Sequence, residues 1–103
     1  MDKKYKLRYL PIFDDDLLNA VNYINKALNN PIAASNLLDK TEEAILSRLK
    51  NPEIFEPYHS TRDRKHPYYR IIVNNFSVFY VVIDDVMEVR RFLYNGRDIP
   101  NFL

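Results

Sequence analysis

The sequence predicts an α+β fold in which a helical hairpin packs on a small antiparallel sheet, in the order strand, helix, helix, strand, strand, strand. Two observations predict it. Residues 14–28 and 31–49 carry apolar side chains at helical spacing, and residues 66–98 hold strand-like runs joined by short polar turns. Because 103 residues can bury one core but not two, we expect residues 1–103 to form a single domain.

The first expected element is a strand over residues 4–10, where tyrosine and leucine alternate with lysine and arginine. This is the period of a half-buried strand, and Pro11 ends it. We expect this strand to pair with the later ones and so extend their sheet.

Two helices follow. The aspartates at 14–16 supply a cap and negative charge for a helix start, and apolar residues at spacings of four, three and four extend this helix to Leu28. Asn30 and Pro31 predict the cap and first position of a second helix that ends before Pro52. So short a connection predicts an antiparallel hairpin.

The last three strands are predicted by composition. Residues 68–73, 76–83 and 86–94 are crowded with valine, isoleucine, phenylalanine and tyrosine, and the pairs Asn74-Asn75 and Asp84-Asp85 separate them as turns. Residues 51–67 contain three prolines and show no clear period, which predicts a long loop.

Charge is unevenly distributed, although the net charge of +1 alone selects no class of partner. Residues 1–58 carry eight Lys or Arg against nine Asp or Glu, whereas residues 59–103 carry seven against five. The basic side chains gather within twelve residues, at His59, Arg62, Arg64, Lys65, His66 and Arg70. This cluster is a candidate anion-binding patch.

Several functional classes are disfavoured. The chain has no cysteine, and two histidines seven apart without a third ligand fit no zinc spacing, so we expect no metal and no cofactor. No apolar run approaches the roughly 20 residues of a membrane helix, and the amino terminus lacks the apolar core of a secretory signal. A cytoplasmic protein without a membrane partner is expected.

Six segments together carry a family pattern. They are the opening strand, the helix beginning DDLLNAVNYI, the second helix introduced by NPIAASNLL, the strands YYRIIV and FSVFYVV, and the closing VMEVRRFLYNGRDI. In order, spacing and total length they resemble the RelE/ParE superfamily of bacterial toxins from type II toxin-antitoxin systems. The resemblance covers nearly the whole chain.

The resemblance implies a growth-inhibiting toxin that a cognate antitoxin holds inactive in a hetero-oligomer. Such an antitoxin folds part of itself onto the toxin, covering apolar surface and opposing arginines with carboxylates. RelE-like members cut messenger RNA in the ribosomal A site, and ParE-like members poison DNA gyrase. If this chain is an enzyme, it is a ribosome-dependent endoribonuclease, an mRNA interferase.

The RNA-cutting branch is matched at two positions. Arg70 falls where that branch has a basic residue and Arg97 where it has a key arginine, and such cations stabilise the charge that develops on the phosphorane. Two departures count against it. Ser77 stands where that branch places an arginine. That branch also places a tyrosine near the carboxyl terminus, where this sequence has Phe102 and Leu103.

Other features resemble the ParE-like, plasmid-stabilisation branch: the NP-x-A-A junction between the helices, the long hairpin and the ending RDIPNFL. Tyr94 stands where that branch often has a histidine. The resemblance therefore favours gyrase inhibition, with RelE-like RNA cleavage as the alternative.

The candidate site residues follow from these two possibilities. If the chain is a nuclease, the catalytic residues would be Arg70, Arg97 and Tyr94. Residues expected to bind the target or RNA are Arg62, Arg64, Lys65, His66 and Arg90. Ordinary surface ion pairing, with Asp98 or Glu88 as the carboxylate, is the alternative role for Arg70 and Arg97.

Adjacent arginines in the last strand should point to opposite faces of the sheet. Val89 and Leu93 are expected to share the face of Arg91, which predicts that Arg91 is partly buried in a structural ion pair. Arg90 is then expected to be the more exposed of the two.

Overall fold

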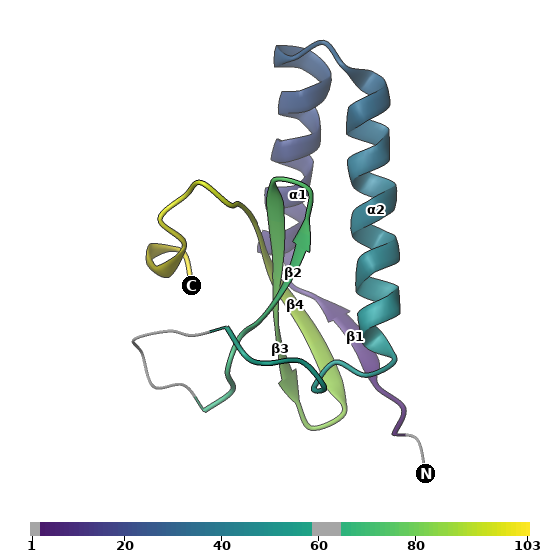
Figure 1. Cartoon of the computed structure of the whole chain (residues 1–103), viewed down its shortest axis with the longest axis vertical. Coiled ribbons are helices and arrows are strands. Elements are labelled where there is room, and N and C mark those ends of the chain that lie inside the picture. Colours follow the sequence, from purple (N-terminus) through teal and green to yellow (C-terminus); the bar gives the residue numbers. More distant parts are fainter. Residues whose placement is uncertain (1–2, 59–64) are drawn as a thin grey trace.

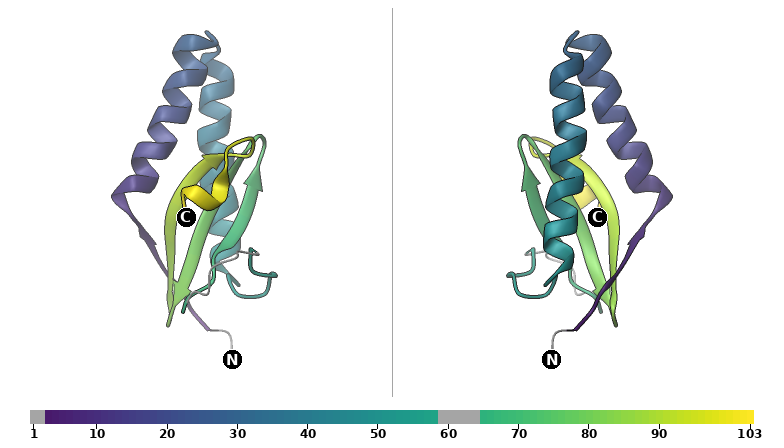
Figure 2. Two further views of the ribbon diagram at one scale, coloured as in Figure 1. Left: turned by 90° about the vertical axis from the view of Figure 1, so that its left-hand side faces the viewer. Right: turned by 90° about the vertical axis from the view of Figure 1, so that its right-hand side faces the viewer.

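The computed structural model of the protein describes residues 3–58 and 65–103. Its elements are strand β1 (Lys6–Tyr9), helix α1 (Pro11–Asn22), π-helical turn η1 (Tyr23–Ala27), helix α2 (Pro31–Leu49), strands β2 (Tyr69–Val73), β3 (Phe76–Ile83) and β4 (Val86–Tyr94), and 3-10 turn η2 (Ile99–Asn101). The predicted α+β fold and element order are confirmed. The helical hairpin packs on one face of the sheet and projects beyond its end (Figure 1; Figure 2).

The sheet has the strand order β1-β4-β3-β2. Strands β2, β3 and β4 form the expected antiparallel meander, but β1 pairs in parallel with β4, from Lys6 opposite Val86 to Tyr9 opposite Val89. The sheet is therefore mixed rather than wholly antiparallel. The antiparallel helices return the chain to the end of the sheet where β1 starts, so β2 and β4 run in the same direction as β1 (Figure 1).

Both predicted turns are present without glycine. Val73 pairs with Phe76 across the first turn and Ile83 with Val86 across the second. Asn74 and Asp84 each take a φ of 55°. Asparagine and aspartate tolerate this left-handed region better than other residues with a side chain, which explains the choice of these turn residues.

The first helix differs from its prediction at both ends. It begins at Pro11, whose fixed φ suits the first helical position, so the aspartates at 14–16 lie inside the helix instead of capping it. Its α-helical part ends at Asn22 and continues as the π-helical turn η1, and Asn29, at a φ of 49°, reverses the chain.

The second helix matches its prediction. Pro31 occupies its first turn, and the Asn30 Oδ1 accepts a hydrogen bond of 3.1 Å from the backbone N–H of Ala33. The predicted cap is confirmed.

The sheet is buried on both faces. On the helix side, Phe13, Leu37 and Ile45 pack on Val78 and Tyr80. A second cluster lies on the opposite side and consists of Tyr68, Phe79, Val81, Leu93 and Ile99, with Tyr58 and Leu103 packed against it. Because β3 is covered on both sides, its sequence is a continuous apolar run rather than an alternating one.

A carboxylate of α1 binds the edge of β4. The carboxylate of Asp16 accepts hydrogen bonds from Arg91 Nε at 2.7 Å and from Arg91 Nη2 at 3.0 Å. It also accepts one from the backbone N–H of Phe92 at 3.0 Å. The expected structural ion pair of Arg91 is confirmed, and it joins the helical layer to the sheet.

The prediction for the neighbours of Arg91 was wrong in one respect. The register between β3 and β4 shifts at Phe79 and Tyr80, which pair with Arg91 and Val89 and leave Arg90 as an extra residue. This bulge turns Val89 to the helix side, whereas Leu93 packs in the opposite cluster. As expected, the Arg90 side chain is the more exposed, at 30% against 16% for Arg91.

Glu88 joins β1 to β4. Its carboxylate is buried and forms ion pairs with Arg8 at 2.7 Å and with Arg90 at 2.6 Å. Burial disfavours the charged form of Glu88, but hydrogen bonds from Arg90 and Arg8 outweigh it and hold the pKa of this carboxyl below its ordinary value.

Replacing Asp16 should destabilise the protein strongly. Asp16→Ala leaves the half-buried Arg91 guanidinium and the Phe92 N–H without their acceptor, so we expect the free energy of unfolding to fall by about 3 kcal/mol. Urea denaturation would measure it. Asp15→Ala, at an exposed position of the same helix, is the matched control and should change the value by less than about 0.5 kcal/mol. Equal small effects from both variants would contradict the role given to Asp16.

Glu88 should make stability depend on pH. Because its pKa is lowered by folding, the stabilisation is fully present above the unfolded value, near pH 4.3, and is lost as pH falls through the folded value. The difference in unfolding free energy between the wild type and Glu88→Gln should therefore be larger at pH 7 than at pH 3. A difference that is the same at both pH values would show that the charge of Glu88 is not what stabilises the pair.

Candidate functional site

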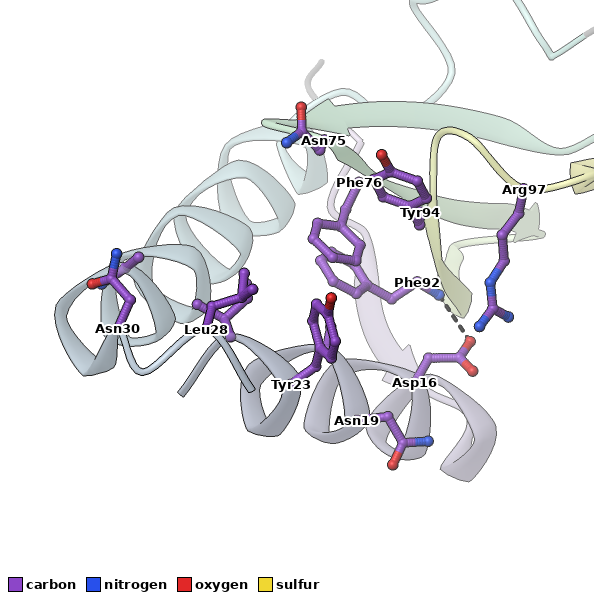
Figure 3. Close-up of a pocket in the computed structure, with 13 residues that line it drawn as sticks. Asp16, Asn19, Tyr23, Leu28, Asn30, Asn75, Phe76, Phe92, Tyr94 and Arg97 are labelled. Atoms are coloured by element: carbon purple, nitrogen blue, oxygen red, sulfur yellow. Dashed lines mark hydrogen bonds between the residues drawn. The ribbon is translucent and has the colours of Figure 1, made fainter. Parts of the chain in front are cut away.

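A pocket of about 790 Å³ opens where the projecting hairpin passes the end of the sheet (Figure 3). It is formed by α1, η1, the start of α2, the start of β3 and the last residues of β4. Its lining residues include Asn19, Tyr23, Ile24, Leu28, Asn30, Asn75, Phe76, Phe92, Tyr94 and Arg97. Its volume lies in the range of binding pockets.

Aromatic rings build one side of this pocket. Phe76 stacks on Phe92 with ring centroids 4.9 Å apart, and Tyr94 meets Phe76 edge to face at 5.7 Å. Around them Tyr23, Leu28 and Tyr94 are each at least half exposed. Exposed apolar side chains gathered around a pocket in this way are candidates for contact with a partner.

The pocket rim carries Arg97. The backbone N–H of Arg97 donates to the Tyr94 carbonyl at 3.0 Å, which closes a four-residue turn directly after β4. The exposed guanidinium lies 5.0 Å from the Phe102 ring centroid. Within residues 3–58 and 65–103, Arg97 is the one arginine whose side chain makes no hydrogen bond or ion pair, so it is available to a partner.

The turn contains the only glycine of the chain. A Cβ added at Gly96 would lie 2.6 Å from Cε1 of Tyr94, closer than real Cβ contacts allow. Gly96 therefore lets the Tyr94 ring fold against the turn that presents Arg97. The φ of Gly96 is not positive, so the requirement is for space.

Arg70 lies on the other face of the sheet. It is opposite Phe79, whose side chain packs in the cluster away from the helices. Its Nε donates to Ser77 Oγ at 2.8 Å and its Nη2 to Asn95 Oδ1 at 3.0 Å. The hydrogen bond to Ser77 restrains Arg70, and because Ser77 is fully buried it is not accessible to a ligand.

The predicted site residues therefore separate. Tyr94 and Arg97 line one pocket, whereas Arg70 faces away from it and Arg90 is paired with Glu88. Lys65 is exposed and His66 half-buried in the segment before β2. Of the remaining candidates, His59, Arg62 and Arg64 lie outside the described residues.

Sequence reasoning missed Tyr23, Leu28 and Asn95. Leu28 was assigned to the buried face of a regular helix, but the π-helical turn changes which side chains face the sheet. Asn95 was not singled out, and its position two residues before Arg97 was the one available signal of its role.

The described residues form neither a group of metal ligands nor a membrane-spanning helix. Among the side chains that the structure describes, no three His, Cys, Asp or Glu gather as metal ligands. No helix formed by those residues is long and apolar enough to cross a membrane.

Comparison with solved structures shows the fold shared with known toxins. The chain is similar to the chromosomal ParDE toxin-antitoxin system of P. aeruginosa, with a TM-score of 0.73 and 13% identity over 88% of this chain and 96% of that one. An archaeal RelE-RelB complex from Pyrococcus horikoshii OT3 gives a TM-score of 0.58 and 17% identity over 91% and 98% of the two chains. The E. coli DinJ-YafQ complex gives 0.53 and 12% over 90% and 94%.

The sequence itself shows the family. A search of curated proteins finds no match. The family model described as the ParE toxin of the parDE type II toxin-antitoxin system matches residues 7–99, which include both helices, strands β2 to β4 and all of β1 except its first residue. The chain belongs to this family of ParE toxins.

Proposed function

We propose that this chain is a growth-inhibiting toxin that acts in the cytoplasm by binding DNA gyrase and is held inactive by a cognate antitoxin. Family membership supports the toxin role. The observation that favours gyrase over RNA is the restraint of Arg70, which extends from the face of the sheet opposite to that of Tyr94 and donates its hydrogen bonds to Ser77 and Asn95.

Cutting RNA needs several groups around one phosphate. A proton acceptor, a proton donor and cations must all reach the reacting atoms within hydrogen-bond distance. Arg70 lies on one face of the sheet, whereas Tyr94 packs against Phe76 on the face that carries the helices. Arg70 and Tyr94 therefore extend from opposite faces of the sheet, which does not favour their acting on one phosphate.

The hydrogen bonds of Arg70 weaken the nuclease hypothesis further. Two of its nitrogens are engaged by Ser77 and Asn95, and Ser77 supplies no cation where a RelE-like enzyme has an arginine. A protein that acts by binding needs no such set. Arg97, exposed beside an apolar pocket, fits a protein target that offers a carboxylate.

The same pocket supports the antitoxin partner. A segment with apolar side chains would bury Tyr23, Leu28 and Tyr94, and would cover Arg97 at the rim. The antitoxin would then inhibit the toxin by occupying the surface that the target needs. Since rim charges contribute little affinity, the apolar part would supply most of the binding free energy for the antitoxin.

Gyrase assays should distinguish the two targets. The purified chain should inhibit supercoiling by gyrase and should trap the complex of gyrase with cleaved DNA. In a parallel assay with programmed ribosomes, the messenger RNA in the A site should stay uncut. Both assays use the same preparation at equal concentrations. Cleaved messenger with intact supercoiling would overturn the gyrase proposal in favour of the RelE-like alternative.

Arg97→Ala should abolish growth inhibition because it removes the free cation at the pocket rim. Its melting temperature should stay close to that of the wild type, since Arg97 is exposed, and antitoxin affinity should fall by less than about tenfold. Induced growth curves, thermal melts and calorimetric titration measure the three quantities. Lys40→Ala, an exposed cation of α2 outside the pocket lining, is the matched control and should stay toxic. A toxic Arg97→Ala, or one that melts much earlier, would contradict the role of Arg97 in contacting the target.

A further inference from the structure

We propose that Arg70 is a positioning residue that fixes the turn bearing Arg97 by way of Asn95. Arg70 would then be required for toxicity without touching the target. The inference rests on the proposed role of Arg97 in contacting that target.

Arg70, Ser77 and Asn95 form a closed triangle of hydrogen bonds. Arg70 donates to Ser77 Oγ at 2.8 Å and to Asn95 Oδ1 at 3.0 Å, and Ser77 Oγ donates to the same Oδ1 at 2.6 Å. The amide oxygen of Asn95 thus receives two hydrogen bonds from two different strands. Its orientation is fixed from β2 and β3 together.

The other groups of Asn95 are also held. Its backbone N–H donates to the Asn75 carbonyl at 2.8 Å, and its Nδ2 donates to the Asn74 carbonyl at 3.4 Å. Asn95 therefore connects the end of β4 to the turn between β2 and β3. These bonds leave the residue little freedom to rotate.

Asn95 is the second residue of the turn that presents Arg97. The turn is closed by the bond from the Arg97 N–H to the Tyr94 carbonyl, and Gly96 packs under the Tyr94 ring. Fixing Asn95 and Gly96 fixes where the chain leaves β4. The direction of the Arg97 side chain over the pocket follows from it (Figure 3).

Arg70 acts in this arrangement through its shape. Its guanidinium lies beside the rings of Tyr58 and Phe79, 5.8 and 5.7 Å from their centroids, and these two rings meet edge to face with centroids 5.4 Å apart. Within the described part of the chain it pairs with no carboxylate, so its hydrogen bonds go to neutral groups. A lysine keeps the charge but cannot donate two bonds in the fixed geometry of a guanidinium.

This distinction gives a sharp test with the full-length chain. Arg70→Lys, Ser77→Ala and Asn95→Ala should each raise the induction level needed for half-maximal growth inhibition about tenfold or more, the factor expected for losing one such hydrogen bond. Melting temperatures and antitoxin affinity identify any variant that merely fails to fold.

A second readout does not depend on the target. The backbone N–H of Arg97 closes the turn, so its hydrogen exchange in solution should quicken about tenfold in Arg70→Lys while amides of α2 stay unchanged. If Arg97→Ala remains toxic, the proposed function is wrong, and amide exchange still tests the positioning role. Full toxicity of Arg70→Lys, or unchanged exchange at Arg97, would overturn the inference.

Discussion

The carboxylate of Asp16 holds the helical layer on the sheet at the point where the sheet loses an edge strand. Strand β1 ends at Tyr9, beside Val89, whereas β4 continues to Tyr94. Beyond that point the Asp16 carboxylate accepts one hydrogen bond from the backbone N–H of Phe92 and two from the Arg91 guanidinium. A side chain of α1 thus takes the place of a neighbouring strand, and it satisfies a backbone donor that would otherwise be left at a covered edge.

The site is formed around this contact. Asp16 and Phe92 both line the pocket, so the distance between α1 and β4 there is set by the hydrogen bond between them (Figure 3). On the other side of β4, Arg91 also donates to the Phe102 carbonyl at 3.1 Å, and the Phe102 ring lies under Arg97. The pocket wall and the segment that follows Arg97 therefore depend on one ion pair.

The sequence was most informative where the signal was local. The two-residue turns and the cap at Asn30 could be predicted because aspartate and asparagine suit left-handed and capping positions whatever the rest of the chain does. The parallel pairing of β1 and the bulge at Arg90 could not, since both depend on contacts between residues far apart in sequence. Asp16 was expected to cap a helix. Its observed partner, Arg91, lies 75 residues away in the sequence, so no local pattern could indicate this pair.

Ser77 shows the limit of reasoning from missing residues. In the sequence, Ser77 was noted only because it stands where the RNA-cutting branch has an arginine. In the structure it is buried and orients Arg70. The substitution thus changes Arg70 from a candidate contact residue into part of the support for the Arg97 turn. Only the pairing of β2 with β3, which places Ile72 opposite Ser77 and Arg70 opposite Phe79, makes this visible.

The surface around Arg97 is proposed to bind a protein target, and photo-crosslinking from that surface is a test of this binding. A photoreactive side chain at position 98, exposed and next to Arg97, would be activated in cells that express the chain without antitoxin. The proposed function predicts covalent capture of a gyrase subunit, and loss of that capture when the antitoxin is present. Capture of messenger RNA or ribosomal components instead would contradict the claim.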